Sequence, residues 1–247
     1  MLDISIAQPP WSAHGKKLES TVRRALYQYQ MLEGVDHVSI ALSGGKDSLT
    51  LLFMLKAIKG RGFPDFKLSA IFVDGEFTCG AGIDIDYLRA VCEHLEVPFV
   101  VERSTQKLET LECYRCSRER RTLIFNAAKK LGATTVAFGH HRDDNAQTIL
   151  MNLLQKAEFA ANQPKIPMID YGVTIIRPLI YASEEDIRIF ARQHGFLRIL
   201  CQCPVGAKSL RKKVEELLRD MEALCPNARH NIAKAGLQYG SDKALTP

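Results

Sequence analysis

The chain places an apolar run, Val38-Ser39-Ile40-Ala41-Leu42, directly before the hexapeptide Ser43-Gly44-Gly45-Lys46-Asp47-Ser48. A helical pattern, Leu49-Thr50-Leu51-Leu52-Phe53-Met54-Leu55, follows at once. Adjacent glycines let backbone N–H groups approach an anion closely, and Asp47 or Ser48 can cap a helix whose positive end points at that anion. The segment therefore predicts a strand, a phosphate-binding loop and a helix in succession. Its spacing differs from G-x-x-x-x-G-K-[ST], so an NTPase that hydrolyses a γ-phosphate is not implied.

Strands and helices are predicted to alternate beyond this loop. Short and mostly apolar segments predict further strands at 67–74, 97–102, 134–138 and 173–176, with helical patterns between them. Residues 158–172 are polar and contain proline, and we expect them to form a loop. The alternation indicates an α/β fold with a doubly wound, mainly parallel five-stranded sheet. Ligands of such sheets lie outside the carboxyl ends of the strands.

Length and composition indicate one α/β domain with small appendages, because the chain has 247 residues of which 46% are hydrophobic. We expect a lead-in and helix at 1–33, a nucleotide-binding domain at 34–200, and a cysteine-containing basic helical appendage at 201–247, with its helix at about 209–224. No uninterrupted apolar stretch is long enough to span a bilayer, and the N-terminus lacks the pattern of a secretion signal. We therefore expect a cytoplasmic protein with no membrane partner. The formal charge of +5 is only weak support for a nucleic-acid partner.

Further polar groups are predicted at the sheet edge that carries the loop. Asp74 follows the second strand, and Gly139-His140 follows the fourth. Asp143 and Asp144 begin the next helix, where carboxylates are favoured by the positive end of the dipole and can reach a bound Mg²⁺. An isolated Asp-Asp pair is more often a helix cap, but this pair lies where a nucleotide site needs its second motif.

Cysteines form two groups in the sequence. Their total of seven is odd, which favours thiol or metal chemistry over a disulfide framework. Cys113 and Cys116 have C-x-x-C spacing, and Cys201 and Cys203 follow the last predicted helix of the sheet. Two soft-ligand groups in a nucleotide-binding protein suggest that folding brings them together. Zinc and an iron-sulfur cluster are both compatible with this pattern.

The ordered set of motifs resembles a known family. Its members are the hexapeptide at 43–48, C-x-x-C-S-R at 113–118, Gly-His-His-Arg-Asp-Asp at 139–144, Ile-Arg-Pro-Leu at 176–179 and the late cysteines. Together they resemble the tRNA 2-thiocytidine synthetase group of the PP-loop ATPases, over most of the chain. The resemblance implies an adenine nucleotide α-hydrolase-like fold and a tRNA sulfurtransferase that splits ATP into AMP and pyrophosphate.

The resemblance also implies which residues bind ATP and perform the chemistry. The expected catalytic residues are Lys46, Asp143 and Asp144, with Mg²⁺ near Asp47 and the two adjacent aspartates. The expected ATP contacts are Ser43, Gly44, Gly45, Lys46, Asp47, Ser48, Asp74, Arg120, Gly139 and His140. In the implied reaction, the C2 carbonyl oxygen of a cytidine is adenylated and sulfur then displaces AMP.

A 4Fe-4S cluster held by three cysteines is the second implied cofactor, and Cys113 and Cys116 match its two early ligands. The family has C-x-x-C at the late site, whereas this chain has C-x-C. Counting back without gaps from Leu210 favours Cys201 as the third ligand, while the Cys203-Pro204 ending is common among cluster ligands and keeps Cys203 as the alternative. The loop at 158–165 also departs from the family, which tends to have glycines and Pro-Pro-Lys there.

The implied partners are tRNA and a sulfur donor such as a cysteine desulfurase, and a homodimer is a further expectation. Basic residues near both cysteine groups are candidates for RNA contact, although a lone basic cluster is more often a solvated helix face. These residues are Arg115, Arg118, Arg121, Lys208, Arg211, Lys212 and Lys213.

Two other functions are compatible with parts of the sequence. In the first, structural zinc on Cys113, Cys116, Cys201 and Cys203 replaces the cluster, in a tRNA-modifying ligase of the lysidine-forming type. In the second, the chain is a non-catalytic module that binds a nucleotide or RNA. Visible absorbance of an anaerobic preparation would argue against the zinc-containing ligase. Release of pyrophosphate that depends on tRNA would argue against the non-catalytic module.

Overall fold

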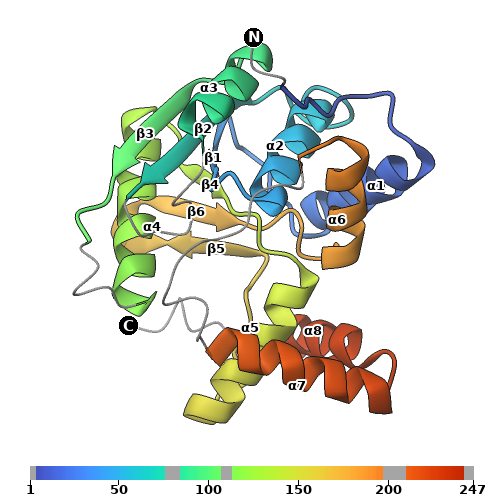
Figure 1. Cartoon of the computed structure of the whole chain (residues 1–247). Coiled ribbons are helices and arrows are strands. Elements are labelled where there is room, and N and C mark those ends of the chain that lie inside the picture. Colours follow the sequence, from blue (N-terminus) through green and yellow to red (C-terminus); the bar gives the residue numbers. More distant parts are fainter. Residues whose placement is uncertain (1–3, 76–83, 107–112, 197–209, 242–247) are drawn as a thin grey trace.

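The computed structural model describes residues 4–75, 84–106, 113–196 and 210–241, and its centre is a six-stranded sheet (Figure 1). The strand order is β3-β2-β1-β4-β6-β5. Every neighbouring pair is parallel except β5 and β6, which confirms the predicted fold class. The strands are β1 His37–Ala41, β2 Lys67–Asp74, β3 Phe99–Arg103, β4 Thr135–Ala137, β5 Lys165–Met168 and β6 Val173–Ile176.

Strand β5 is the difference from the predicted five-stranded sheet, because it lies within the segment 158–172 that was expected to be a loop. It pairs antiparallel with β6, and Pro167 lies opposite Thr174. Proline is tolerated on an edge strand, where one side of the backbone has no partner. Ile166 is buried beside Ile175, so one apolar residue in a polar segment anchors the strand. A sequence pattern with one buried position is too short to predict a strand.

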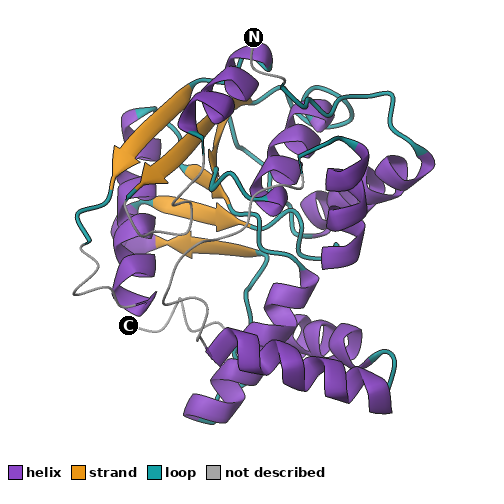
Figure 2. Cartoon of the chain, viewed as in Figure 1, coloured by secondary structure: helices purple, strands orange, loops and turns teal. Residues whose placement is uncertain are grey.

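Helices cover both faces of the sheet, as Figure 2 shows. One face packs against α1 (Ala13–Gln28), α2 (Lys46–Ile58), α3 (Ile85–His94) and α6 (Glu184–Gln193), and the other packs against α4 (Cys113–Lys130). Side chains of β2 alternate between the two layers: Phe72 belongs to the first core, and Ile71 and Val73 belong to the second. Both faces of the strand are therefore buried, as parallel strands require.

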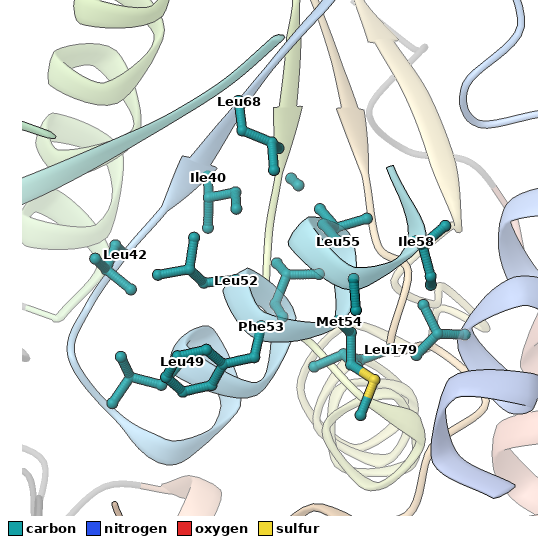
Figure 3. Close-up of a cluster of buried hydrophobic side chains, with 14 of the residues drawn as sticks. Ile40, Leu42, Leu49, Leu52, Phe53, Met54, Leu55, Ile58, Leu68 and Leu179 are labelled. Atoms are coloured by element: carbon teal, nitrogen blue, oxygen red, sulfur yellow. The ribbon is translucent and has the colours of Figure 1, made fainter. Parts of the chain in front are cut away.

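Helix α2 lies at the centre of the larger core (Figure 3). Its side chains from Ser48 to Leu55 are all buried, and Leu52 lies near Ile40 of β1. A helix that is apolar on every side is stable only in the interior of a protein. This burial fixes the beginning of α2, and with it the preceding hexapeptide, at the carboxyl end of β1.

A third, smaller core joins α5 (Arg142–Lys156), α7 (Leu210–Leu224) and α8 (Ala228–Tyr239), which lie together below the sheet in Figure 1. Sequence patterns predicted α7 but not α8. The approach of α8 to α5 is so close that a Cβ at Gly236 would lie 2.1 Å from Ile149 Cδ1. Among the helices of the described ranges, none combines the length and apolar character needed to cross a bilayer.

Candidate functional site

A cavity of about 340 Å³ opens at the carboxyl ends of the central strands, at the edge where ligands of doubly wound sheets bind. Four elements supply its walls: the end of β1 with the start of α2, the strand β2, the helix α4, and the segment from β4 into α5. The lining residues are Ala41, Leu42, Ser43, Asp47, Ser48, Ile71, Val73, Cys116, Ser117, Arg120, Arg121, Ile124, Phe138, Gly139, His140 and Asp144.

The loop before α2 is shaped to receive an anion. Gly44 has a φ of +78°, a conformation that favours glycine, and Gly45 is the N-cap residue of α2. Because Gly45 makes no side-chain capping bond, the first N–H groups of α2 are available to a ligand. Ser48 fixes the turn by donating a hydrogen bond from its hydroxyl to the Gly45 carbonyl oxygen at 3.0 Å.

Gly139 allows the segment after β4 to lie directly against the start of α2. A Cβ at this position would lie 3.1 Å from the backbone nitrogen of Ser48 and 3.1 Å from the carbonyl carbon of Asp47. Separations this short against backbone require a shift of the chain. The absence of a side chain at Gly139 therefore brings two loops of the cavity into contact.

Phe138 and His140 form an aromatic pair at the cavity wall. Their rings are stacked, with centroids 5.7 Å apart and an interplanar angle of 23°. Burial, with the charge of Arg177 as the next cause, lowers the pKa of His140 to about 3, so its imidazole is neutral at neutral pH. Its Nδ1 atom is buried and has no hydrogen-bond partner among the residues that the structure describes, which leaves one polar atom for a ligand.

Asp144, like Asp47, is a carboxylate residue in the cavity wall. Its Oδ2 accepts a hydrogen bond from the His141 backbone N–H at 3.1 Å, and its Oδ1 accepts one from Arg211 Nη1 at 3.1 Å. Burial raises the pKa of Asp144, but electrostatic interactions with its basic neighbours, of which that with His141 is the largest, outweigh burial and lower it to about 2. Asp144 is therefore ionised at neutral pH and is a weak proton acceptor.

Asp47 and Asp144 both lie near the same imidazole nitrogen. His141 Nε2 is 3.7 Å from Asp47 Oδ1 and 3.5 Å from Asp144 Oδ2. Asp47 Oδ1 is buried and makes no hydrogen bond within the described part of the chain, although the Lys46 ammonium lies 3.1 Å away as an ion pair. The spare oxygen of Asp47, with the carboxylate of Asp144 nearby, suits a Mg²⁺ ion that takes its other ligands from phosphate and water. Within the described ranges, no cluster of three or more His, Cys, Asp or Glu residues would hold a metal without such help.

Lys46 and Asp143 lie next to the cavity but are not part of its lining. Lys46 Nζ is 3.1 Å from Asp47 Oδ1 and 3.3 Å from Glu184 Oε1. Burial lowers the pKa of Lys46, but these two carboxylates outweigh it and raise that pKa. Asp143 is buried. Its carboxylate accepts a hydrogen bond from Arg142 Nε at 2.9 Å and another from the Glu184 backbone N–H at 2.8 Å. The adjacent acids thus differ: Asp144 contacts the cavity, and Asp143 fixes the start of α6.

Comparison with known proteins identifies the group to which these features belong. The family described as the PP-loop domain matches residues 17–197. The chain is 32% identical to a tRNA-cytidine(32) 2-sulfurtransferase of Geobacter sulfurreducens, over 89% of this chain and 88% of that protein. It is 36% identical to a protein of the same name from Ralstonia nicotianae, over 89% of this chain and 72% of that protein. The chain belongs to the PP-loop family of tRNA-cytidine sulfurtransferases.

A solved PP-loop structure shares the fold. It is that of the U34-tRNA thiolase NcsA from Methanococcus maripaludis with its [4Fe-4S] cluster. Its TM-score to this chain is 0.73, with 21% sequence identity, over 92% of this chain and 80% of that one. At this level of identity the likeness shows that the two proteins have the same fold.

The early cysteines of this PP-loop protein come from the first turn of α4. Cys116 is 8% exposed and lines the cavity, and Cys113 is the first residue of the same helix. Cys201 and Cys203 lie outside the described residues, so their expected convergence with Cys116 stays a prediction. Arg120, one turn after Cys116, also lines the cavity.

The structure adds residues that the sequence patterns did not single out. Phe138 and His141 lie within or beside the predicted motif at 139–144, and their neighbourhood could have suggested them. Glu184 is the first residue of α6, and it binds Lys46. Asp74 was expected to contact ATP. It ends β2 and accepts a hydrogen bond from Ser104 through its backbone carbonyl, and it is not part of the cavity lining.

Proposed function

We propose that this chain replaces the C2 carbonyl oxygen of a cytidine in tRNA with sulfur, in an ATP-dependent reaction that gives 2-thiocytidine. Its membership of the family makes it a tRNA sulfurtransferase. The observation that carries the detailed proposal is that Cys116 and the phosphate-binding loop line the same cavity. A sulfur-handling residue beside a nucleotide site supports activation and sulfur transfer at one place.

ATP would lie with its pyrophosphate on the first N–H groups of α2 and its base against the apolar wall. That wall contains Ile71 and Val73 of β2 and Ile124 of α4. The aromatic pair of Phe138 and His140 adds a flat surface beside it. Apolar walls with a few polar groups are typical of sites that bind a planar base and orient its charged end.

Positive charge in the site would stabilise the charge that develops on phosphorus during adenylation. The cytidine O2 atom attacks the α-phosphorus and pyrophosphate leaves, and negative charge on the oxygens is met by cations. Arg120 and Arg121 line the cavity and could supply this charge. Asp47 and Asp144 would hold the Mg²⁺ that accompanies ATP. Because its carboxylate is a weak base, we assign Asp144 a role in binding cations rather than in accepting a proton.

Sulfur must then replace the adenylated oxygen. Attack of sulfur on C2 breaks the carbon–oxygen bond, and the oxygen leaves as part of AMP. A [4Fe-4S] cluster on Cys113, Cys116 and Cys201 would supply sulfur for this exchange. The burial of Cys116 fits such a cofactor, because cluster ligands are shielded from water.

The tRNA would approach α4, whose first turns carry exposed basic residues beside the cavity. Arg115 and Arg118 are exposed, and Arg118 lies over the ring of Tyr114 at 5.8 Å. Tyr114 is itself 66% exposed. Exposed arginines with an aromatic side chain suit phosphate contact and base stacking. The sulfur donor, the homodimer, the cytoplasmic location and the three-part division of the chain stay predictions.

Nucleoside mass spectrometry of tRNA tests the proposal directly. Cells that lack this protein should lose 2-thiocytidine, and the wild-type chain should restore it. The Cys116→Ser variant should fail to restore it, whereas Cys225→Ser should succeed, because Cys225 is exposed at the turn between α7 and α8. Unchanged 2-thiocytidine in the deletion strain, or loss of a different thionucleoside, would refute the proposed substrate.

A further inference from the structure

Arg211 joins the C-terminal helices to the nucleotide cavity. It lies in the first turn of α7, and its Nη1 atom donates hydrogen bonds to Asp144 Oδ1 at 3.1 Å and to Gln147 Oε1 at 2.8 Å. Asp144 and Gln147 are three residues apart on α5, so they lie on the same side of that helix. One guanidinium therefore binds the first turn of α5 at the edge of the cavity.

The electrostatics of α7 alone do not account for an arginine at this position. The beginning of a helix carries a partial positive charge, which disfavours a cation in the first turn. Asp144 is in the first turn of α5, where the same effect favours a carboxylate. The attraction that places the Arg211 side chain therefore comes from the cavity carboxylate rather than from its own helix.

Polar contacts continue from this pair to the far end of α7. Gln147 Nε2 donates to Glu215 Oε2 at 2.8 Å. Arg229 of α8 binds both oxygens of Glu215, at 2.8 and 2.9 Å, and also binds Glu222 at 3.1 Å. Arg229 is only 7% exposed, so this network is part of the packing of α7 against α8. A continuous set of polar contacts therefore connects Asp144 to both α7 and α8.

Two cations would compete for the carboxylate of Asp144. Arg211 binds Asp144 in the structure, and a divalent ion that accompanies ATP would be bound by Asp144 and Asp47. The Arg211 side chain is 44% exposed, so it can leave Asp144 for solvent. A salt bridge with such exposure is weak, and a divalent ion with phosphate ligands can replace it.

We propose that Arg211 is a positioning residue through which α7 and α8 respond to the nucleotide cavity. It neutralises Asp144 while no divalent cation is bound, and the divalent cation that accompanies ATP displaces it. This inference depends on the proposed binding of ATP and Mg²⁺. It adds that the arrangement of α7 depends on whether the cation is present.

Equilibrium binding of α,β-methylene ATP, measured with Mg²⁺ and with EDTA, tests the inference. In Arg211→Ala, Asp144 loses its neutralising partner and repels the nucleotide, so affinity in EDTA should fall about fivefold. Affinity in Mg²⁺ should not fall and should rise by up to about fivefold, because the ion no longer competes with Arg211 for the carboxylate. Arg219→Ala removes the same charge from α7, at a side chain that is 71% exposed, and should have no effect in either condition. An equal loss in both conditions for Arg211→Ala, or no loss in EDTA, would overturn the inference.

An Asp144→Asn background separates the specific contact from a general effect on folding. If Arg211 acts through Asp144, adding Arg211→Ala to Asp144→Asn should cause no further loss in EDTA. A persistent fivefold loss in this background would contradict the inference. Arg211→Lys, which keeps the charge, should restore part of the affinity.

Hydrogen exchange of the wild-type chain gives a test that needs no variant. Amides of α7 should exchange faster with the analogue and Mg²⁺ than with the analogue and EDTA, while those of α2 stay protected. If bound nucleotide is verified and α7 exchanges identically in both conditions, the proposed role of Arg211 is refuted but the proposed function is not. Failure of the analogue to bind in either condition would refute the proposed function, and this inference with it.

Discussion

Gly139 lies so close to Ser48 that a Cβ added to it would be 3.1 Å from the Ser48 backbone nitrogen. This contact joins the segment after β4 to the first turn of α2. Both parts line the cavity, and neither can move without the other. The approach of two backbones therefore fixes the shape of the phosphate-binding loop.

We predict that Gly139→Ala weakens nucleotide binding about tenfold, because the methyl group pushes α2 away from β4. Destabilisation should be about 1–3 kcal/mol, as for other insertions into packed interiors. For stability, Gly45→Ala is the steric control, since a Cβ there would lie 3.6 Å from Ser43 Oγ, an ordinary contact. It is no control for binding, because Gly45 belongs to the phosphate-binding loop. Thermal unfolding and binding of α,β-methylene ATP measure the two effects. A Gly139→Ala protein as stable as Gly45→Ala would show that the chain absorbs the methyl group easily.

Leu52 provides a test of the core that supports the loop. Its side chain is fully buried among the first-core residues of Figure 3, so Leu52→Ala should destabilise the chain by about 2–5 kcal/mol. Leu154→Ala removes the same atoms from a residue that is 63% exposed and should change stability by less than about 0.5 kcal/mol. Urea unfolding measures both. Equal midpoints for the two variants would contradict the observed burial.

Arg229 should stabilise the pair of C-terminal helices through Glu215 and Glu222. The Arg229→Met variant removes the guanidinium that binds both carboxylates. We expect the free energy of unfolding to fall by about 1–3 kcal/mol near neutral pH. Arg219→Met removes an exposed cation that is 3.4 Å from Glu215, and it should cost less than about 0.5 kcal/mol. Urea unfolding at fixed pH compares the two variants with the wild type.

The effect of Arg229→Met should depend on pH. Burial raises the pKa of Glu215, but its hydrogen bonds to Arg229 and Gln147 outweigh burial and lower it below its ordinary 4.5. A lowered pKa in the folded state gives stability that is present above the ordinary value and lost as pH falls through the folded value. The difference between wild type and Arg229→Met should therefore be constant above about pH 5.5 and shrink below about pH 4. A difference that grows on acidification would show that Glu215 is not the partner.

Much of the fold followed from local patterns, because strands buried on both faces are apolar runs. The segments that became β1, β2 and β6 carry enough apolar residues to be recognised, and β2 spans Lys67–Asp74 as predicted. Strand β5 has one buried residue, Ile166, and is held by its pairing with β6. Such a strand depends on its pairing with the next strand, which its own residue pattern does not show, so only the folded chain reveals it.

Candidate site residues were predictable in groups but not in their individual roles. The motif spacing placed Asp143 and Asp144 side by side in a helix start, and adjacent residues of a helix point in different directions. Which of them contacts the cavity is decided by the packing of α6, through the hydrogen bond from the Glu184 N–H to Asp143. Arg211 belongs to none of the recognised motifs, and 67 positions of sequence separate it from Asp144, so local patterns could not predict their contact.

The two adjacent aspartates provide the sharpest test of the site. Asp144→Asn keeps the shape of the side chain but removes the charge, so Mg²⁺-dependent binding of α,β-methylene ATP should weaken at least about tenfold. Asp143→Asn should lower the unfolding temperature instead, because it weakens the contacts with Arg142 and Glu184, and should change Mg²⁺-dependent binding less than about threefold.

The contribution of Asp144 should not vary between about pH 5 and pH 8, because its pKa of about 2 keeps it ionised throughout that range. Calorimetric titration with the nucleotide analogue at several Mg²⁺ concentrations measures the binding, and differential scanning fluorimetry measures the stability. If Asp143→Asn and Asp144→Asn weaken binding equally at matched stability, the cation is shared by both carboxylates. The division of roles that follows from the buried position of Asp143 would then be wrong, since its side chain would have to turn from Arg142 towards the cavity.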